Sequence, residues 1–255
     1  MTERRSFEDL LAEGESVPTA GWDFSWFDGR ATEQRPSWGY ARLMGERMRH
    51  ADAALDLQTG GGEVLATIPE PPRRLVATES WPPNLAVARG NLRRLGASVV
   101  EVPDAGPLPF EDAGFDLVVS RHPTVTVWSE IARVLRPGGS YLSQQVGAGS
   151  MHELTEAMMG PTPVSPDRST ERAVAQATEA GLTVRDLRHE SLRTVFFDIA
   201  AVVHYLRKVI WIVPGFTVEK YRDPLYAVHR QIEDTGSFVA YSKRFLIDAA
   251  KDQPA

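Results

Sequence analysis

The 255-residue sequence contains no cysteine, which excludes disulfides, thiol catalysis and metal sites built on cysteine. It also has no excess of positive charge. The sequence contains 28 lysines and arginines and 34 aspartates and glutamates, which gives a formal net charge of -6. An acidic chain is poorly suited to extended binding along a phosphate backbone. The charge therefore argues weakly against a nucleic-acid partner, and no metal site is predicted.

The sequence also has no long uninterrupted apolar run. Its most apolar stretch, residues 195–213, is broken by Asp198, His204, Arg207 and Lys208, and it predicts a buried or amphipathic helix rather than a membrane span. The N-terminus is polar and no apolar segment follows it, which argues against a signal peptide. These absences favour a cytoplasmic protein without membrane attachment.

What is present is an ordinary globular composition. Hydrophobic residues make up 42% of the chain and charged residues 24%, which is enough for a sizeable core. The length fits one large domain, or one domain with an added cap. We expect a monomer or a homodimer.

Short apolar runs alternate with helical patterns along the chain. Strands are predicted at 53–57, 75–78, 99–102, 115–119, 140–146, 182–187 and 238–247. Helices are predicted at 38–48, 63–68, 84–95, 127–135, 151–159, 171–180, 195–212 and 218–233. Elements of these lengths in this order predict an α/β fold, with a doubly wound, mostly parallel, seven-stranded sheet and helices on both faces.

A glycine-rich turn follows the first predicted strand, in the run Asp56-Leu57-Gln58-Thr59-Gly60-Gly61-Gly62. Doubly wound sheets bind ligands at the carboxyl ends of their strands, beside such a turn. Glycines there let the backbone approach a ligand closely and expose amide groups at a helix start. A glycine triplet alone fits any tight turn, and a dehydrogenase would need a further glycine where Leu65 stands.

Carboxylates follow the next two predicted strands. Glu79 ends the second strand and could accept the hydroxyls of a ribose, while Asp104 and Ala105 follow the third and could read an adenine edge. Each acidic residue alone is equally a helix cap or a turn former. The glycine turn, Glu79 and Asp104 lie at the ends of three successive strands, and together they favour a nucleoside-binding site.

Several motifs between Leu55 and about Val146 occur in the order found in a known family. The chain has Asp56, Gln58, Gly60 and Gly62 in the first turn, the acidic Glu79, the run DAGPLPF at 104–110 and the run EIARVLRPGG at 130–139. Together they resemble class I (Rossmann-like) S-adenosylmethionine-dependent methyltransferases of the type 11 kind, more narrowly a bacterial subgroup of unknown acceptor. The first motif of that family is D-x-G-x-G-x-G, so Gln58 replaces its first glycine.

The resemblance implies a transferase (EC 2.1.1.-) with S-adenosylmethionine as its cofactor. By position, Gly60 and Gly62 would meet the amino-acid part of the cofactor, and Asp56 would orient the loop or meet the ammonium group. Glu79 would hold the ribose, and Asp104 would accept from the adenine amino group. The full set of implied cofactor contacts is Asp56, Gln58, Gly60, Gly62, Glu79, Ser80, Trp81, Asp104, Ala105 and Ser120.

Methyl transfer from a sulfonium is an in-line displacement that needs alignment and sometimes removal of a proton. His122 is the candidate catalytic base, because it follows the fourth strand where the acceptor should enter, although it is equally a hydrogen-bonded loop histidine ahead of Pro123. Arg121 could bind an acceptor carboxylate or phosphate, or form a salt bridge. Gln144 and Gln145 end the fifth strand on opposite faces, so only one should reach the acceptor.

Aromatic residues gather in the N-terminal segment. Trp22 and Trp26 are candidate acceptor contacts by resemblance, since similar enzymes often close this segment over their ligands; core filling is the other interpretation. We expect residues 1–50 to form a lid segment. Residues 51–255 would form the methyltransferase domain, with 148–235 partly a cap.

Three functions stay open at this point. The first is a methyltransferase for a small-molecule acceptor, at oxygen, nitrogen or carbon. The second is an RNA base methyltransferase, against which the acidic charge counts. The third is a non-catalytic cofactor-binding protein, which the glutamine at position 58 would allow.

Overall fold

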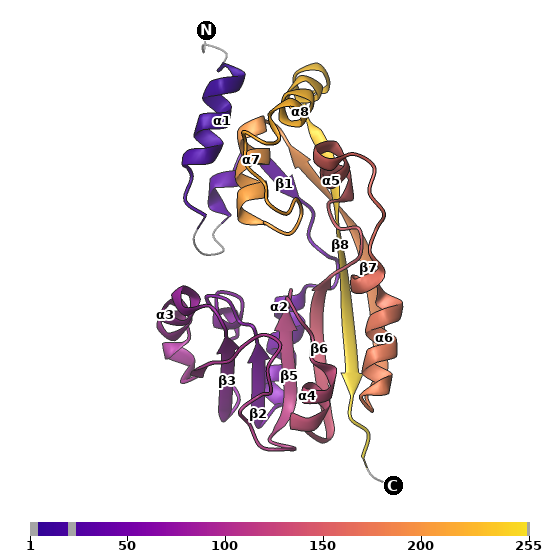
Figure 1. Ribbon diagram of the computed structural model, residues 1–255. Coiled ribbons are helices and arrows are strands. Elements are labelled where there is room, and N and C mark those ends of the chain that lie inside the picture. The colour runs from indigo at the N-terminus through magenta and orange to yellow at the C-terminus, as the bar shows by residue number, and fades with distance from the viewer. Residues whose placement is uncertain (1–4, 20–23, 254–255) are drawn as a thin grey trace. The chain divides into compact units, whose positions relative to one another are not determined.

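The computed structural model describes residues 5–19 and 24–253 (Figure 1). Its strands are β1 (Ala31–Glu33), β2 (Ala53–Leu57), β3 (Arg74–Glu79), β4 (Ser98–Glu101), β5 (Phe115–Arg121), β6 (Leu135–Val146), β7 (Thr183–Phe196) and β8 (Phe238–Ala250). Its helices are α1 (Phe7–Ser16), α2 (Tyr40–His50), α3 (Pro82–Asn91), α4 (Trp128–Val134), α5 (His152–Met159), α6 (Thr170–Glu179), α7 (Ile199–Lys208) and α8 (Arg222–Thr235). The strands form one eight-stranded sheet in the order β1-β7-β8-β6-β5-β2-β3-β4.

The parallel part of the sheet has β2 at its centre. β2 pairs in parallel with β3 on one side and with β5 on the other, and the parallel pairs β3–β4 and β5–β6 extend the sheet outward. β8 runs antiparallel to β6, as expected for the last strand. The chain therefore changes direction across the sheet between β2 and β5, and a ligand crevice belongs at the carboxyl ends of these strands.

The sheet has eight strands rather than the seven that the sequence predicts. The additional strand is β1, which pairs antiparallel with the last three residues of β7. Three residues are too few to show the period-two pattern by which a strand is recognised, so the sequence gives no sign of β1.

β7 is also longer than predicted. The predicted helix 195–212 begins only at Ile199, because the strand continues to Phe196. Leu192, Thr194 and Phe196 are all buried and lie at alternate positions, which is strand periodicity. The apolar run that follows conceals this boundary in the sequence.

The chain divides into two compact units. The larger unit comprises residues 36–148, 166–190 and 244–255, and the smaller unit comprises residues 1–35, 149–165 and 191–243. A lid formed by residues 1–50 and 148–235 stays a prediction. Within the described residues, none of the helices combines the length and apolar character needed to cross a membrane.

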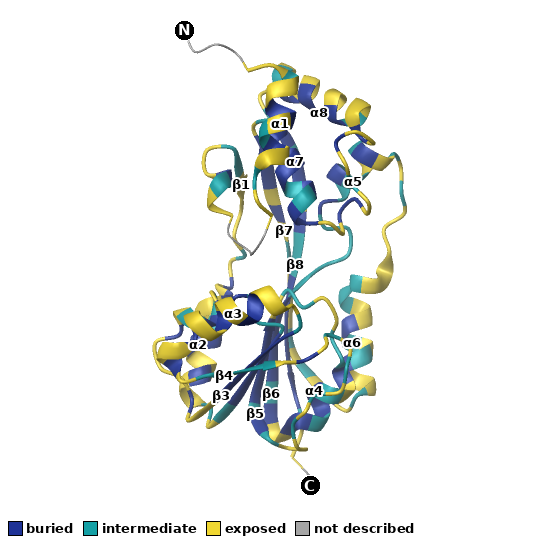
Figure 2. Ribbon diagram, turned by 60° about the vertical axis from the view of Figure 1, so that its left-hand side comes forward, coloured by how far each residue is buried: buried dark blue, intermediate teal, exposed yellow. Residues whose placement is uncertain are grey.

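Both faces of the parallel strands are buried in the larger unit. Leu55 and Val118 pack on one face with Trp128 and Ile131 of α4. Their strand neighbours Ala54, Leu117 and Val119 point to the other face, where they pack with residues of α2 and α3. Figure 2 shows these strands as almost wholly buried ribbon. This is the burial expected of a doubly wound sheet, whose strands read as nearly continuous apolar runs.

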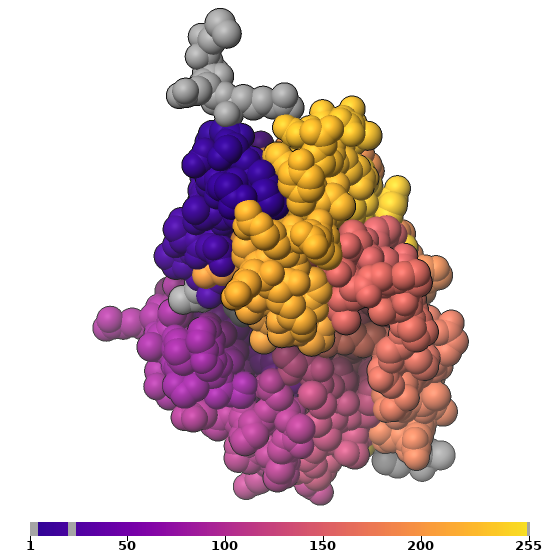
Figure 3. All heavy atoms as spheres, turned by 45° about the horizontal axis from the view of Figure 1, so that its top comes forward, coloured from indigo at the N-terminus to yellow at the C-terminus, as the bar shows by residue number. Residues whose placement is uncertain are grey.

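The smaller unit is built around α7, which is buried along most of its length. α1 packs against it, and Phe7 at the start of α1 contacts Tyr226 and His229 of α8 through ring contacts at 5.2 and 5.1 Å between centroids. Figure 3 shows the atoms of α1 lying directly against those of the α7–α8 region. The capping box of Ser6 and Asp9 fixes where α1 begins.

Gly14 allows α1 to approach α7 closely, because a Cβ at this position would lie 2.6 Å from the carbonyl oxygen of Ala200 and 2.9 Å from Cβ of Val203. Gly14→Ala should therefore lower the free energy of unfolding by about 1–3 kcal/mol, the usual cost of overpacking. Urea unfolding followed by circular dichroism measures this change.

Gly90 provides the matched control. It lies in α3, and a Cβ there would meet no atom within 4 Å. Gly90→Ala should leave stability unchanged or raise it by up to about 1 kcal/mol, since alanine is the better helix former. Equal effects of the two substitutions would show that the α1–α7 approach does not depend on Gly14.

Candidate active site

The candidate site lies at the carboxyl ends of β2, β3, β4 and β5, within the larger unit. The turn after β2 needs left-handed backbone, with φ of 65° at Gly60 and 75° at Gly62. Gly62 also lies against Leu92, the residue that follows α3. A Cβ at position 62 would come within 2.9 Å of Leu92 Cγ. Glycine at these two positions thus sets both the shape of the turn and its closeness to the next helix.

Glu79 ties the end of β3 to this turn. Its side chain is buried, and Oε2 accepts a hydrogen bond of 2.7 Å from the amide of Gly60. Oε1 accepts from the amides of Ser80 and Trp81 at 3.0 and 2.9 Å. Two carboxylate oxygens offer about four acceptor sites, so at least one site remains for a ligand hydroxyl.

Asp56 is a buried carboxylate at the end of β2. Thr59 donates its hydroxyl hydrogen to Asp56 Oδ2 at 2.6 Å. Burial raises the pKa of Asp56 to about 7, the hydrogen bond from Thr59 opposes that rise, and the negative charge of Glu79 adds to it. A buried carboxylate of this kind is favourable for a cationic ligand group, which would compensate its charge.

Gln58 adopts left-handed backbone with φ of 56°, although glutamine has a Cβ. Its amide oxygen accepts from the backbone N–H of Thr124 at 2.6 Å, and its Nε2 donates to the carbonyl oxygen of Val125, also at 2.6 Å. The side chain therefore fastens the turn after β2 to the segment after β5. These bonds hold the unusual backbone conformation, which would otherwise cost about 1–2 kcal/mol.

Asp104 joins the same network. The hydroxyl of Thr124 lies 2.6 Å from Asp104 Oδ2 and 3.0 Å from Gln58 Oε1, and its single hydrogen can go to only one of them. Between these groups is a cavity of about 20 Å³, whose apolar walls include Leu57 and Val125. That volume is enough for about one water molecule.

The other residues that the resemblance assigns to the cofactor differ in exposure. Trp81 is 46% exposed at the start of α3, and Ala105 is exposed in the turn after β4. Ser120 is instead fully buried, with its Oγ 2.7 Å from the Tyr141 hydroxyl and 2.8 Å from Ser143 Oγ. The structure thus brings Ser80, Trp81 and Glu79 together, and it places the Ser120 hydroxyl between β5 and β6.

His122 follows β5 and bonds to β6. Its backbone N–H donates to the carbonyl oxygen of Gln144 at 2.7 Å, and its Nε2 lies 2.9 Å from Nε2 of Gln144. Gln144 in turn accepts from the indole N–H of Trp38 at 2.8 Å. Burial lowers the pKa of His122 well below its usual range, and the charges of Arg121 and Arg244 lower it further.

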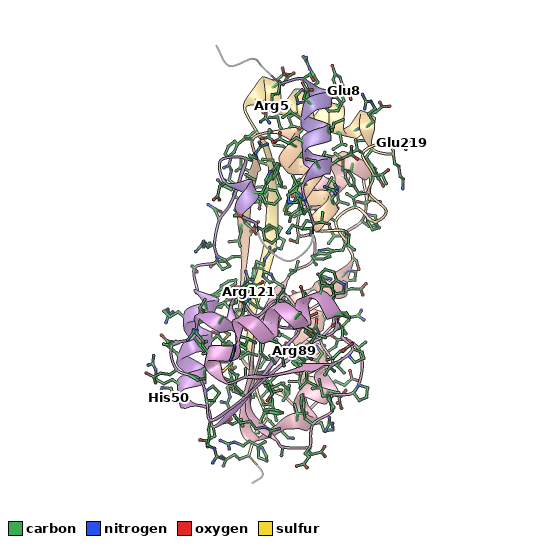
Figure 4. All side chains as sticks on the ribbon, turned by 90° about the vertical axis from the view of Figure 1, so that its left-hand side faces the viewer. Arg5, Glu8, His50, Arg89, Arg121 and Glu219 are labelled. Carbon is green, nitrogen blue, oxygen red and sulfur yellow. The ribbon has the colours of Figure 1, made fainter. Side chains whose placement is uncertain are left out.

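The remaining candidates are dispersed. Arg121 is exposed at the end of β5 (Figure 4), and Gln145 is half-buried with its amide 3.5 Å from the Tyr141 hydroxyl. Trp26 belongs to the smaller unit, where the Arg30 guanidinium lies 4.4 Å from its ring centroid. Trp22 lies outside the described residues.

Two residues that make hydrogen bonds in the candidate site, Thr124 and Trp38, belong to no sequence motif. Thr124 follows β5 without any pattern that sets it apart from other loop residues, and Trp38 reads as one more aromatic residue before α2. Their parts in the site come from partners far along the chain, at a separation of 20 residues for Asp104 and 106 for Gln144. No local signal could have found them.

A segment that begins within β2 and ends within β6 matches a known family. Residues 55–143 match the family model described as a methyltransferase domain. A malonyl-[acyl-carrier protein] O-methyltransferase from Marinomonas sp. (strain MWYL1) is 31% identical over 121 residues, which are 44% of this chain and 45% of that protein. The match thus spans less than half the length of this curated relative.

Solved structures share the fold. A proposed methyltransferase from Bacillus halodurans C-125 aligns with a TM-score of 0.61 at 19% identity, over 85% of this chain and 100% of its own. A geranyl diphosphate methyltransferase, solved with GPP and sinefungin, aligns with a TM-score of 0.52 at 13% identity, over 83% of this chain and 76% of its own. The chain therefore has the Rossmann-like fold of class I methyltransferases, and its residues 55–143 match a methyltransferase domain.

Proposed function

We propose that this chain transfers the methyl group of S-adenosylmethionine to a small-molecule acceptor by in-line displacement. The observation that carries the proposal is the hydrogen bond between Glu79 and the Gly60 amide, with the Asp56 carboxylate buried beside it. A ribose acceptor, backbone amides and an anionic group for an ammonium then lie at one sheet edge. Those are the groups that an adenosyl amino acid requires.

The residues fit the cofactor by their chemistry. Asp56 would face its ammonium group, Glu79 its ribose, and Asp104 with the apolar walls of the small cavity its adenine. When bound, the cofactor supplies an activated methyl group on a sulfonium, so the protein has only to bind, orient and exclude water. The relative from Marinomonas, named an O-methyltransferase, supports oxygen as the acceptor atom.

The network of Gln58 is the one observation that favours a non-catalytic protein, because it narrows the adenine cavity. Isothermal titration with S-adenosylmethionine separates the two functions. Binding by the folded protein supports the enzyme, and labelled cofactor with a metabolite extract then identifies the acceptor. A folded protein that binds neither S-adenosylmethionine nor its demethylated product would remove the enzymatic proposal.

Glu79→Ala should weaken cofactor binding about 10- to 100-fold, because the ribose hydroxyls and the Gly60 amide both lose a charged acceptor. Isothermal titration gives the dissociation constants. Glu101→Ala is the matched control, since Glu101 is the exposed partner of Glu79 in the β3–β4 register. Unchanged affinity in the Glu79 variant, with its fold intact, would contradict the site assignment.

Cofactor affinity should fall as the pH drops below 7. Asp56 has a pKa of about 7 in the free protein, and an ammonium group beside it would favour the ionised form. Binding then releases a proton, and affinity decreases by up to about tenfold per pH unit between pH 7 and pH 5.5. Titrations in buffers of different ionisation enthalpy count the protons released, and Asp56→Asn should abolish the release.

The raised pKa of Asp56 also determines how the stability of the folded protein changes with pH. The folded protein keeps the proton of Asp56 up to about pH 7, whereas the unfolded chain releases it near the ordinary aspartate pKa of 3.8. The contribution of Asp56 to stability is therefore lost as pH rises between these values. Asp56→Asn should raise the melting temperature at pH 8, and a lowered value would show that the carboxylate is compensated in the free protein.

Gln58→Ala should increase the association rate of the cofactor, because it removes the bonds that hold the segment after β5 over the adenine cavity. Stopped-flow fluorescence of the exposed Trp81 measures the rate. Gln253→Ala, at the opposite end of the strands, is the control and should leave the rate unchanged. A slower association in the Gln58 variant would mean that these bonds preorganise the site.

A further inference from the structure

A buried chain of hydrogen bonds fixes the orientation of the Gln144 side chain. The indole N–H of Trp38 can only donate, so the atom that it meets at 2.8 Å must be the amide oxygen of Gln144. The other end of the amide is then its NH₂ group, which lies 2.9 Å from Nε2 of His122. Trp38 and Gln144 are 3% and 4% exposed, so water does not compete for the bond between them, while His122 is half-buried.

The orientation of Gln144 decides the tautomer of His122. An NH₂ group only donates, so Nε2 of His122 must accept with its lone pair, and the proton of the neutral ring must be on Nδ1. A protonated ring would set two donors against each other. The backbone of His122 is held as well, by its N–H bond to the Gln144 carbonyl, with φ of 55°.

We propose that Trp38 and Gln144 are positioning residues that hold His122 as a neutral Nδ1–H donor, and that the acceptor of methyl transfer is a carboxylate. The proposal rests on the proposed function. Nδ1 already carries a hydrogen and Nε2 accepts the bond from Gln144, so His122 could take a proton from the acceptor only by losing that bond. The acceptor oxygen must arrive with its electron pair available, and a carboxylate does so at neutral pH.

The charges around His122 agree with an anionic acceptor. Arg121 on β5 and Arg244 on β8 are the charged groups whose potential acts on the ring, and both are positive. The same potential that disfavours an imidazolium favours a carboxylate beside Nδ1–H. A phenol would have to lose a proton as it attacks, and His122 in this tautomer could receive that proton only by losing its bond from Gln144. A neutral amine attacks through its lone pair and needs no base, but it is not an oxygen acceptor of the kind that the proposed function favours.

The chemical step balances without a protein base. A carboxylate oxygen attacks the methyl carbon, the bond from sulfur to that carbon breaks, and its electron pair stays on sulfur. A carboxylate and a sulfonium become a neutral methyl ester and a neutral thioether, and no proton is transferred. His122 donates a hydrogen bond to the acceptor and orients it for in-line attack.

Nitrogen NMR of histidine-labelled protein tests the tautomer independently of activity. Comparison with His122→Asn assigns the signals, and His189→Gln, an exposed histidine of β7, is the matched control. We expect His122 to remain neutral with Nδ1 protonated from pH 8 to pH 6. Gln144→Leu should let the ring exchange tautomers or take a proton. An Nε2–H tautomer or an imidazolium in the wild-type protein at pH 7 would overturn the positioning role.

Two substitutions at His122 separate a donor from a base. Asparagine tolerates left-handed backbone and carries an N–H near the place of Nδ1, so His122→Asn should keep turnover within about tenfold of wild type. His122→Ala should lose about 10- to 100-fold in turnover with cofactor affinity unchanged. Equal losses in both variants, or turnover that falls with the ionisation of a histidine, would indicate a base.

Labelled S-adenosylmethionine offered with matched carboxylic acids, phenols and amines tests the acceptor class. Label should pass to carboxylic acids, giving methyl esters that mild alkali hydrolyses. If the protein binds S-adenosylmethionine but labels only phenols or amines, the carboxylate proposal fails while the proposed function stands. If it does not bind S-adenosylmethionine, the proposed function fails and the carboxylate proposal fails with it, whereas the NMR measurement still decides the tautomer.

Discussion

The hydrogen bond from the Gly60 amide to Glu79 is the contact on which the candidate site depends. It joins the turn after β2 to the end of β3 at 2.7 Å, with the carboxylate buried. The bond is charge-assisted, which makes it stronger than a bond between neutral groups. It also fixes the glycine turn relative to the Glu79 carboxylate, so the shape of the turn and the position of the proposed ribose acceptor are set together.

Burying charge at this edge of the sheet has a cost for the free protein. The pKa of Asp56 rises to about 7, chiefly because of burial and to a smaller degree because of the negative charge of Glu79. A cationic ligand group would remove that penalty. Stability and ligand binding are therefore opposed at Asp56, as they commonly are at sites where charge is held ready for a ligand.

The proposed acceptor side is organised differently, by neutral groups between β5 and β6. Ser120, Tyr141 and Ser143 form a buried hydroxyl cluster, and Tyr40 donates to the carbonyl oxygen of Ser120 at 2.9 Å. Gln144, which follows Ser143, connects two rings through its side-chain amide. The amide accepts from the Trp38 indole and donates to the His122 imidazole. Fully satisfied polar networks of this kind are rigid, which suits a site that must align an acceptor rather than activate it.

The sequence by itself determined the sheet of alternating units and most of the edge at which the site lies. Strand and helix periodicity are local, and parallel strands bring their carboxyl ends together, so Asp56, Glu79 and Asp104 could be placed near one another without coordinates. The sequence did not predict the short β1 or the full length of β7. Three residues are too few to show a strand period, and an apolar helix follows β7 closely.

Only the tertiary structure decided how the side chains are used. Gln58 could be recognised as a departure from a glycine pattern, but its bonds to Thr124 and Val125 depend on the loop after β5. The tautomer of His122 depends on Trp38, which is 106 positions from the glutamine that connects them. Hydrogen-bond direction and burial are properties of neighbours in space, and no spacing along the chain encodes them.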